Sequence, residues 1–110
     1  MEINWNDFEK IDIRCGTICS AIAFEKAKKP AYQLEIDFGP LGKKKSSAQI
    51  TKHYSINELI GKQVIAVINF PVKQIANFFS ECLVLGVYDE NNDVVLIEPN
   101  KLVGNGSKIG

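Results

Sequence analysis

Alternation of hydrophobic and polar residues is the feature that most constrains how this chain folds. Tyr32, Leu34, Ile36 and Phe38 are hydrophobic, and the three residues between them are polar. Because successive side chains of a β-strand point to opposite faces, this segment is predicted to be a strand with one buried and one wet face. The chain has 110 residues, enough for a single core. We therefore expect one domain, over residues 1–110, with an all-β fold.

The remaining segments predict four further strands and one short helix. The expected strands lie at 11–24, 46–51, 63–70 and 82–88, and a hairpin joins 87–89 to 94–97. The hydrophobic phase of the first strand changes at Gly16, which predicts a β-bulge there. The strand at 63–70 is hydrophobic on both faces and should be covered on both sides. Ser55 and Glu58 have the spacing of a capping box, so a short helix is expected between the third and fourth strands.

Three strands, a short helix and two more strands are the order found in the OB-fold, a five-stranded Greek-key barrel. An SH3-like barrel has a similar number of strands, but the helix after the third strand favours the OB-fold. No apolar run approaches the roughly 18 residues that a membrane-spanning helix needs. Membrane insertion is therefore not expected.

Charge is distributed unevenly although its total is zero. The chain has 13 basic and 13 acidic residues. Residues 1–25 and 74–110 each carry a net charge of −3, whereas residues 26–73 hold nine lysines against three acids and carry +6. A fold that gathers this basic middle on one face would attract phosphates. A solvated surface of mixed sign is the alternative.

Catalytic and metal-binding motifs are absent from the sequence. His53 is the only histidine, and no nucleophile or acid is signalled beside it. Cys15, Cys19 and Cys82 do not have zinc-site spacing, and their odd number indicates a reducing compartment. Residues 1–10 are polar and acidic, unlike a signal peptide. We expect a cytoplasmic protein that is not an enzyme and that uses no metal or cofactor.

Lysines at strand ends indicate a surface for nucleic acid. Lys26, Lys28 and Lys29 flank the turn before the second strand, and Lys43, Lys44 and Lys45 flank the turn after it. Lys52 follows the third strand, and Lys73 follows the fourth. Such lysines follow a phosphate backbone without selecting a base sequence. Polar residues that could bond to sugars or base edges are Ser46, Ser47, Gln49 and Asn69. A lysine run in a solvated loop is the alternative.

A second candidate surface is hydrophobic. Ile75, Phe78 and Phe79 follow Pro71 within a short stretch of the chain. They could belong to the core, to a dimer interface or to a groove for unfolded peptide. The core or a dimer interface is the favoured interpretation.

Six sequence blocks resemble the tRNA-binding OB domain that is appended to methionyl-tRNA synthetases and also occurs as free-standing dimers. The blocks are 12–18, 29–32, 36–39, 46–51, 69–75 and 80–86. The fourth and fifth are most similar to the CsaA branch, the small export-related chaperones. Polar residues shared with this family are Arg14, Ser46, Ser47, Gln49, Asn69, Lys73 and Ser80. Val72 stands where the family usually has a second proline, so the loop that holds Lys73 is expected to be less rigid.

The resemblance implies an OB barrel whose terminal extensions complete a homodimer. It implies a protein that binds tRNA or another structured RNA and acts as a chaperone in protein secretion. The alternative is a chaperone that holds unfolded secretory precursors in an apolar groove at Ile75, Phe78 and Phe79, with RNA binding secondary. A third interpretation is an accessory module that only dimerises a partner.

Overall fold

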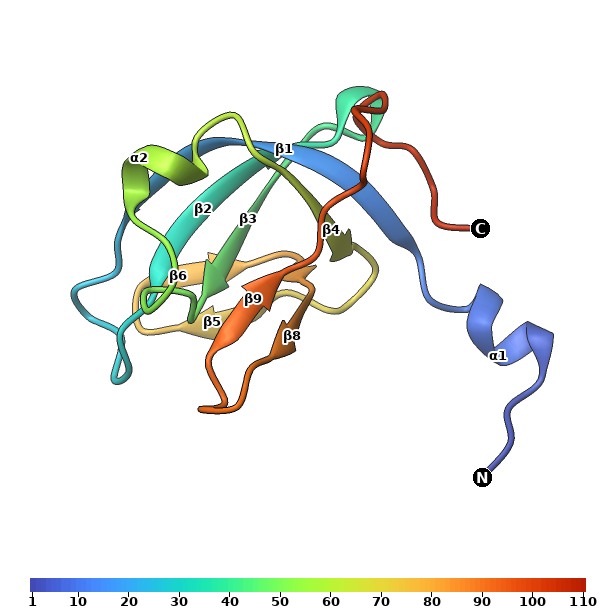
Figure 1. The fold of residues 1–110 in the computed structure, drawn as a ribbon, viewed down its shortest axis with the longest axis horizontal. Coiled ribbons are helices and arrows are strands. Elements are labelled where there is room, and N and C mark those ends of the chain that lie inside the picture. The colour runs from blue at the N-terminus through green and yellow to red at the C-terminus, as the bar shows by residue number, and fades with distance from the viewer.

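Five antiparallel strands curl into a nearly closed barrel in the computed structural model, which describes residues 1–110 (Figure 1). The strands are hydrogen-bonded in the order β3–β2–β1–β4–β7. Their bounds are β1 Ile13–Ala23, β2 Tyr32–Asp37, β3 Lys43–Ala48, β4 Gln63–Val67 and β7 Leu83–Val84. The helix α2, Ile56–Leu59, lies between β3 and β4, and Glu58 Oε1 accepts the N–H of Ser55 at 3.0 Å. The predicted all-β, OB-like fold is confirmed.

The barrel closes where residues 80–82 lie against β3. The N–H of Glu81 donates to the carbonyl oxygen of Lys45 at 2.8 Å, and the Ser46 hydroxyl donates to the carbonyl of Cys82 at 2.9 Å. These bonds connect the chain just before β7 to the strand at the other end of the sheet order. Along this stretch β3 therefore has no free edge.

The core is formed by inward-facing residues of the strands. Large side chains that are fully buried inside the barrel are Ile18, Leu34, Ile36, Phe38 and Val64. Burying each of them contributes roughly 1.5–3 kcal/mol relative to leaving it in water. All residues of β4 are buried, as its hydrophobicity on both faces predicts. The C-terminal segment helps to cover this strand, because Gln63 Nε2 donates to the carbonyl of Val103 at 2.7 Å.

Gly16 serves close packing, and the β-bulge expected there is wrong. A β-carbon at Gly16 would lie 2.7 Å from Cγ2 of Ile36 and 2.8 Å from the Phe38 ring. The irregularity of β1 lies instead between Ile18 and Ser20, where its register against β2 shifts. Glycine within a strand has two physical causes, a bulge or a close approach of neighbouring groups, and here the second applies.

Several strand boundaries differ from the predicted ones. β3 begins at Lys43, so the lysine run belongs to the strand, and the short 3-10 turn η1 (Gly39–Leu41) precedes it. β4 ends at Val67 rather than at residue 70. The predicted fifth strand divides into β7 and β8 (Gly86–Tyr88), and β8 pairs with β9 (Val94–Leu96) in the expected hairpin. It divides because Leu85 changes partners: its N–H donates to Ile65, whereas its carbonyl accepts from Ile97.

A hairpin that the sequence pattern does not predict joins β5 (Lys73–Ile75) to β6 (Phe78–Ser80). Its turn places Ala76 at a φ of 52°, a conformation that side chains other than asparagine and aspartate rarely adopt. Phe78 packs on Phe24 with ring centroids 5.4 Å apart, in a small cluster that includes Ala31. This cluster anchors the hairpin to the loop between β1 and β2.

Both chain ends lie on the same side of the barrel (Figure 1). Helix α1, Trp5–Glu9, stands apart from the sheet. The C-terminal segment runs along β1, where the N–H of Cys15 donates to the carbonyl of Ser107 and the N–H of Ile109 donates to that of Ile13, both at 2.9 Å. None of the helices is both long enough and apolar enough to cross a membrane.

Candidate nucleic-acid interface

A groove of about 1190 Å³ opens beside β3, β5 and the β8–β9 hairpin. Figure 1 shows these elements together at the lower end of the barrel. The walls of the groove are formed by residues 29–30, 47–52, 70–75, 80–86 and 92–94, together with Tyr88. The lining mixes hydrophobic, polar and charged side chains. The groove can therefore contact flat apolar surfaces and charged groups of the same ligand.

Three lysines, here called the groove lysines, reach this groove from different segments. Lys29 comes from the β1–β2 loop, Lys52 from the turn after β3, and Lys73 from the start of β5. All three are exposed, and none takes part in the ion pairs of the molecule. Glu81 also lines the groove, but its Oε1 accepts the N–H of Lys45 at 2.9 Å. The groove lysines thus remain available to an anionic ligand, although Glu81 and one aspartate in the wall reduce the net positive charge.

Two exposed aromatic rings lie in the same groove. The side chain of Phe70 is 55% exposed and that of Tyr88 is 74% exposed. Aromatic rings stack on the flat faces of nucleobases, which every base presents regardless of its identity. A concave surface that combines free lysines with exposed rings is suited to nucleic acid with accessible bases.

Five of the predicted RNA-binding residues line this groove: Ser47, Gln49, Lys52, Lys73 and Ser80. They come from β3, from the turn after it and from the β5–β6 hairpin. Gln49 is exposed, and its amide offers both donors and an acceptor to a base edge. The fold thus brings together residues that the sequence separates by more than thirty positions.

Lys43 and Lys45 of the lysine run lie on a different surface, the outer face of β2 and β3, whereas Lys44 stands opposite the buried Ile36. Lys43 is directly opposite Asp37, and Lys45 is directly opposite Glu35. Residues opposite each other in an antiparallel pair have β-carbons about 4.5–5.5 Å apart. Lys44, between them, is half-buried. Lys43 and Lys45 therefore lie beside the carboxylates of the preceding strand.

The pKa of Cys19, on the neighbouring strand β1, depends on the charges of this outer face. Burial makes the largest contribution to the raised pKa of its thiol, and the Glu35 carboxylate raises the pKa further. Lys43 lowers the pKa by less than Glu35 raises it. At this position the carboxylates outweigh the ammonium group.

Comparison with protein-family models matches residues 13–108 to a family described as "Putative tRNA binding domain". The chain belongs to this tRNA-binding domain family. The match runs from the start of β1 to the C-terminal segment that pairs with it. The predicted family resemblance is therefore confirmed.

Two solved structures are similar to this tRNA-binding domain over their whole length. Chaperone CsaA from Bacillus anthracis is 53% identical, with a TM-score of 0.95 and 100% of each chain covered. The CsaA chaperone protein from Picrophilus torridus is also 53% identical, with a TM-score of 0.93, 99% of this chain covered and 100% of that one. The similarity to the CsaA branch is confirmed as well.

The tRNA-binding domain also matches part of a larger enzyme. A methionine–tRNA ligase from Parabacteroides distasonis is 35% identical over 107 residues. The aligned region covers 97% of this chain but 16% of the ligase. The chain thus spans about 16% of the length of the curated relatives it matches first.

Two predicted RNA-binding residues hold the ends of the tRNA-binding domain in place. Arg14 Nε lies 2.6 Å from Asp12 Oδ1, and the guanidinium also donates to the carbonyl of Gly106 at 3.1 Å. Asn69 accepts the N–H of Asp12 at 3.0 Å and donates to the carbonyl of Lys10 at 2.7 Å. These bonds engage the same side-chain groups that an RNA ligand would use.

Two predicted serines take part in closing the barrel. Ser46 is buried, and its hydroxyl is bonded to Cys82. The hydroxyl oxygen of Ser80 accepts the N–H of Ser47 at 3.2 Å. Burial raises the pKa of the adjacent Cys82 thiol to about 11, so this thiol stays protonated at neutral pH. The contact between residues 80–82 and β3 therefore stabilises the closed barrel of this tRNA-binding domain.

The three residues predicted for peptide binding do not share one surface. Phe78 is buried against Phe24, and Ile75 packs beside that cluster while also lining the groove. Phe79 is 54% exposed and lies opposite Gln74 on the hairpin. Only Phe79 presents a freely exposed ring, and it lies outside the groove lining.

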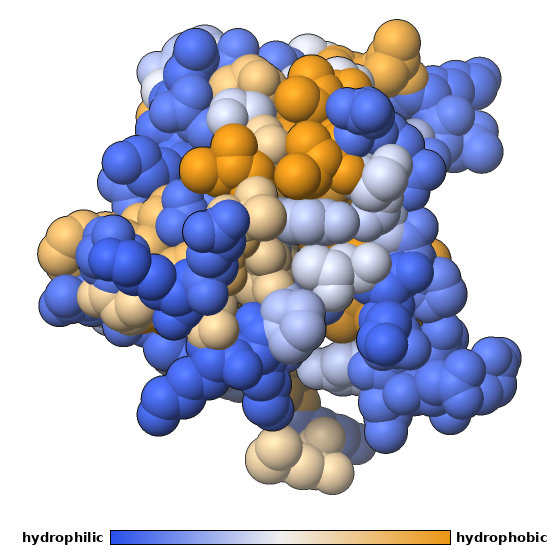
Figure 2. Space-filling view, turned by 90° about the vertical axis from the view of Figure 1, so that its left-hand side faces the viewer, coloured by the Kyte–Doolittle hydropathy of each residue, from blue (hydrophilic) through white to orange (hydrophobic).

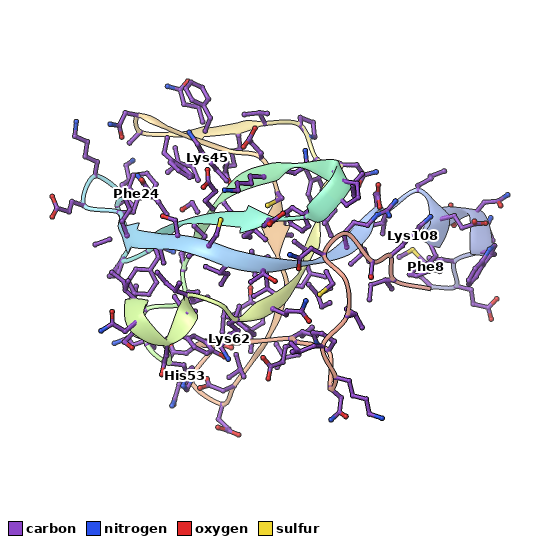
Figure 3. All side chains as sticks on the ribbon, turned by 90° about the horizontal axis from the view of Figure 1, so that it is seen from above. Phe8, Phe24, Lys45, His53, Lys62 and Lys108 are labelled. Atoms are coloured by element: carbon purple, nitrogen blue, oxygen red, sulfur yellow. The ribbon has the colours of Figure 1, made fainter.

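His53 and Asp89 join two segments beside the groove. His53 Nε2 lies 2.6 Å from Asp89 Oδ2, and hydrogen bonds from the Asp93 N–H and from His53 lower the pKa of the Asp89 carboxyl. Asp93 brings a third donor atom, and all three lie within 4.8 Å of one another, close enough to hold a metal ion. Figure 3 shows His53 and Lys45 on opposite sides of β1, so this cluster is remote from the lysine run.

Sequence reasoning missed two aromatic residues of the groove, Phe70 and Tyr88, whereas Lys29 is one of the lysines that flank a predicted turn. Lys29 and Phe70 stand in two of the family-like blocks, and Phe70 precedes Pro71 at a predicted strand end. An aromatic residue directly before a proline at a predicted strand end is the signal that could have identified Phe70. Tyr88 carries no such signal, because it was expected within a strand.

Proposed function

We propose that this chain binds structured RNA, and tRNA in particular, through the surface around the groove. The observation that carries the proposal is the match of residues 13–108 to the tRNA-binding domain family. The three exposed groove lysines support it, because phosphate contacts supply much of the affinity of proteins for RNA.

The predicted residues take different parts in this interface. Lys52 and Lys73, joined by Lys29, contact phosphates, and Ser47 and Gln49 contact sugar hydroxyls or base edges. The lysine run of β3 makes weaker, peripheral contacts, because Asp37 and Glu35 lie opposite it. Residues that keep the interface in shape are Arg14, Ser46, Asn69 and Ser80.

We also propose that the chain forms a homodimer through its terminal segments. Hydrophobic side chains that are largely exposed there are Ile3, Trp5, Leu102 and Val103. Exposed hydrophobic groups in two terminal segments are typical of an interface. Two copies double the RNA-binding surface, and the second contact is favoured by its high effective concentration. Sedimentation should give twice the 12.2 kDa of one chain, and a monomer at micromolar concentration contradicts the dimer.

We further propose that the protein acts as a chaperone in secretion. The similarity to two proteins named CsaA chaperone supports this activity. We place the protein in the cytoplasm, where tRNA and unfolded precursors both occur, and assign it no catalytic step. Figure 2 shows one face of the molecule on which hydrophobic residues gather in the upper middle, beside residues of intermediate hydropathy, with hydrophilic residues mainly towards the edges.

A chaperone that binds secretory precursors, with RNA secondary, is the second candidate function. The groove favours it in one respect, because Val72 and Leu83 in its wall are 59% and 47% exposed. Binding of this kind would depend weakly on salt and show a negative heat-capacity change. Charge-driven RNA binding would instead weaken steeply with salt.

Titration of tRNA at several salt concentrations tests the proposed function. Each phosphate contact adds roughly 0.7–0.9 to the slope of log affinity against log salt. Three groove lysines should therefore give a slope of about −2 or steeper for each protomer. An absence of binding at low salt, or an affinity that does not change with salt, would contradict the proposal.

A further inference from the structure

We infer that the groove takes an unpaired segment of RNA, with bases stacked on Phe70 and Tyr88 and phosphates beside the groove lysines. The inference rests on the proposed RNA binding and specifies which part of the RNA enters this site. It also moves the principal contact away from the lysine run of β3.

The exposed rings distinguish unpaired from paired RNA. In a duplex the faces of the bases are covered by stacking, and the A-form major groove is too deep and narrow for side chains to read. A ring inside a concave site can reach a base face only where that base has left its stack. Phe70 and Tyr88 both lie in the groove and are more than half exposed. A duplex would meet the lysines of this site but leave the rings without partners.

The groove lysines are placed to follow a strand that passes the rings. Lys29, Lys52 and Lys73 enter from three separate segments of the wall. Across the β5–β6 pair the residue opposite Lys73 is Ser80, so no carboxylate lies there. Backbone phosphates of a single strand can therefore pair with these ammonium groups while the bases turn inward.

A bound peptide would use the groove less completely. An extended peptide that adds to a sheet needs a free strand edge. β3 does not offer such an edge, because the N–H and the carbonyl of Lys45 are both bonded to Glu81, and the N–H of Ser47 is bonded to Ser80. Of the other strands that line the groove, β5 and β8 each pair with one neighbour only, so the lack of a free edge holds for β3 alone. An apolar peptide segment would also desolvate the groove lysines without pairing them, which is unfavourable. A single strand of RNA satisfies both the charges and the rings.

The test uses the full chain and two RNA probes of identical sequence. One is an unstructured 12-nucleotide strand that carries 2-aminopurine, whose fluorescence is quenched when it stacks. The other is the same strand paired with its complement. At equal salt the single strand should bind at least tenfold more tightly than the duplex, with quenching of the 2-aminopurine. Equal affinity for the two probes, or binding without quenching, would overturn the inference.

Ring-removing variants locate the bases. Phe70→Leu and Tyr88→Leu keep a hydrophobic side chain but remove the flat ring, and Phe79→Leu is the matched control outside the groove lining. Stacking on one ring contributes roughly 1–3 kcal/mol per base, so each groove variant should weaken single-strand binding by about fivefold or more. The salt slope should stay the same. Loss of affinity in the Phe79 control alone would contradict the assignment.

The outcome separates this inference from the proposed function. If tRNA binds with a steep salt slope and the groove variants bind all RNA as well as the unchanged chain, the inference fails and the proposed function stands. If no RNA binds even at low salt, both fail. If an unfolded polypeptide binds in a way that Phe70→Leu weakens, while the single strand does not bind, the groove is a peptide site and the inference is overturned.

Discussion

The groove lysines and the lysine run of β3 differ in what lies opposite them. The run is contiguous in the sequence, but in the sheet Lys43 and Lys45 face Asp37 and Glu35. The groove lysines are more than twenty positions apart in the sequence, yet they line one concavity together with two exposed rings. Clustering of charge along a chain therefore says little about the field at the surface, because strand pairing decides which charges become neighbours.

The energies involved explain why this difference matters for binding. Opposite charges that face each other across a strand pair stabilise it by roughly 0.2–1 kcal/mol. A phosphate that approaches the lysine run must compete with carboxylates that are already close. Neither set of lysines takes part in an ion pair. The two sets differ in their neighbours: Lys43 and Lys45 have carboxylates on the facing strand, whereas Lys73 faces Ser80.

A β-carbon at Gly16, packed beneath β2, should change the free energy of unfolding more than any other substitution considered below. Gly16→Ala places a β-carbon against Ile36 and Phe38, on the inner side of the strand that carries Glu35 and Asp37. Such overpacking should lower the free energy of unfolding by roughly 1–3 kcal/mol, measured by chemical denaturation. Gly104→Ala is the control, because its new β-carbon has no neighbour closer than 3.8 Å. Similar losses in both variants would contradict the role given to Gly16.

The carboxylates opposite the lysine run should weaken its contact with RNA, and neutralising them tests this effect. Replacing Glu35 by Gln and Asp37 by Asn removes the carboxylates opposite the lysine run. We expect tRNA to bind about two- to fivefold more tightly, because phosphates that approach Lys43 and Lys45 are then no longer repelled by the facing carboxylates. The double variant Glu2→Gln with Glu9→Gln changes the net charge equally at the N-terminal segment. An equal gain in that control would mean that total charge, rather than the opposing carboxylates, sets the affinity.

A smaller effect concerns the rim of the groove at Asp89. Its pKa lies below the ordinary value of 3.8, chiefly because its carboxylate accepts the Asp93 N–H and then because it meets His53. The carboxylate therefore stabilises the fold above pH 3.8, and this contribution is lost as the pH falls through the lowered pKa. Asp89→Asn should be less stable than the unchanged chain at neutral pH, with a difference that shrinks in acid. A difference that stays constant over pH contradicts this role.

The smallest expected change is in the pKa of Cys19, whose thiol lies on the outer face and serves as a probe of its charges. Glu35→Gln should lower the pKa of Cys19, and Lys43→Ala should raise it by a smaller amount. The rate of reaction with a thiol reagent, followed against pH, measures both shifts. Cys15 and Cys82 are buried and should stay silent until the chain unfolds. A larger shift from Lys43→Ala would show that the ammonium group dominates this face.

The fold was predictable where side-chain alternation is strong. The inward residues Leu34, Ile36 and Phe38 identify β2, and the position of the short helix identifies the OB-like order of strands. The β5–β6 hairpin was not predictable, because its strands are only three residues long and its turn uses Ala76 at positive φ. The start of β3 was missed because three consecutive lysines have no alternation to mark a strand.

The candidate interface was predictable only in part. Lys52 and Lys73 could be identified as phosphate partners from their positions at strand ends. That Lys29, Phe70 and Tyr88 lie with them depends on how the β1–β2 loop and the two small hairpins fold over the barrel. Such long-range placement is set by tertiary packing, which local sequence patterns do not encode.

Two triple variants test most directly whether the groove lysines, rather than the lysine run, carry RNA binding. One replaces Lys29, Lys52 and Lys73 by Ala, and the other replaces Lys43, Lys44 and Lys45 by Ala, so both lose the same charge. The measurement is the slope of log tRNA affinity against log salt. We expect the groove variant to lose about two to three units of slope per protomer and the β3 variant to lose less than about one. Equal losses, or a larger loss in the β3 variant, would contradict the central role of the groove.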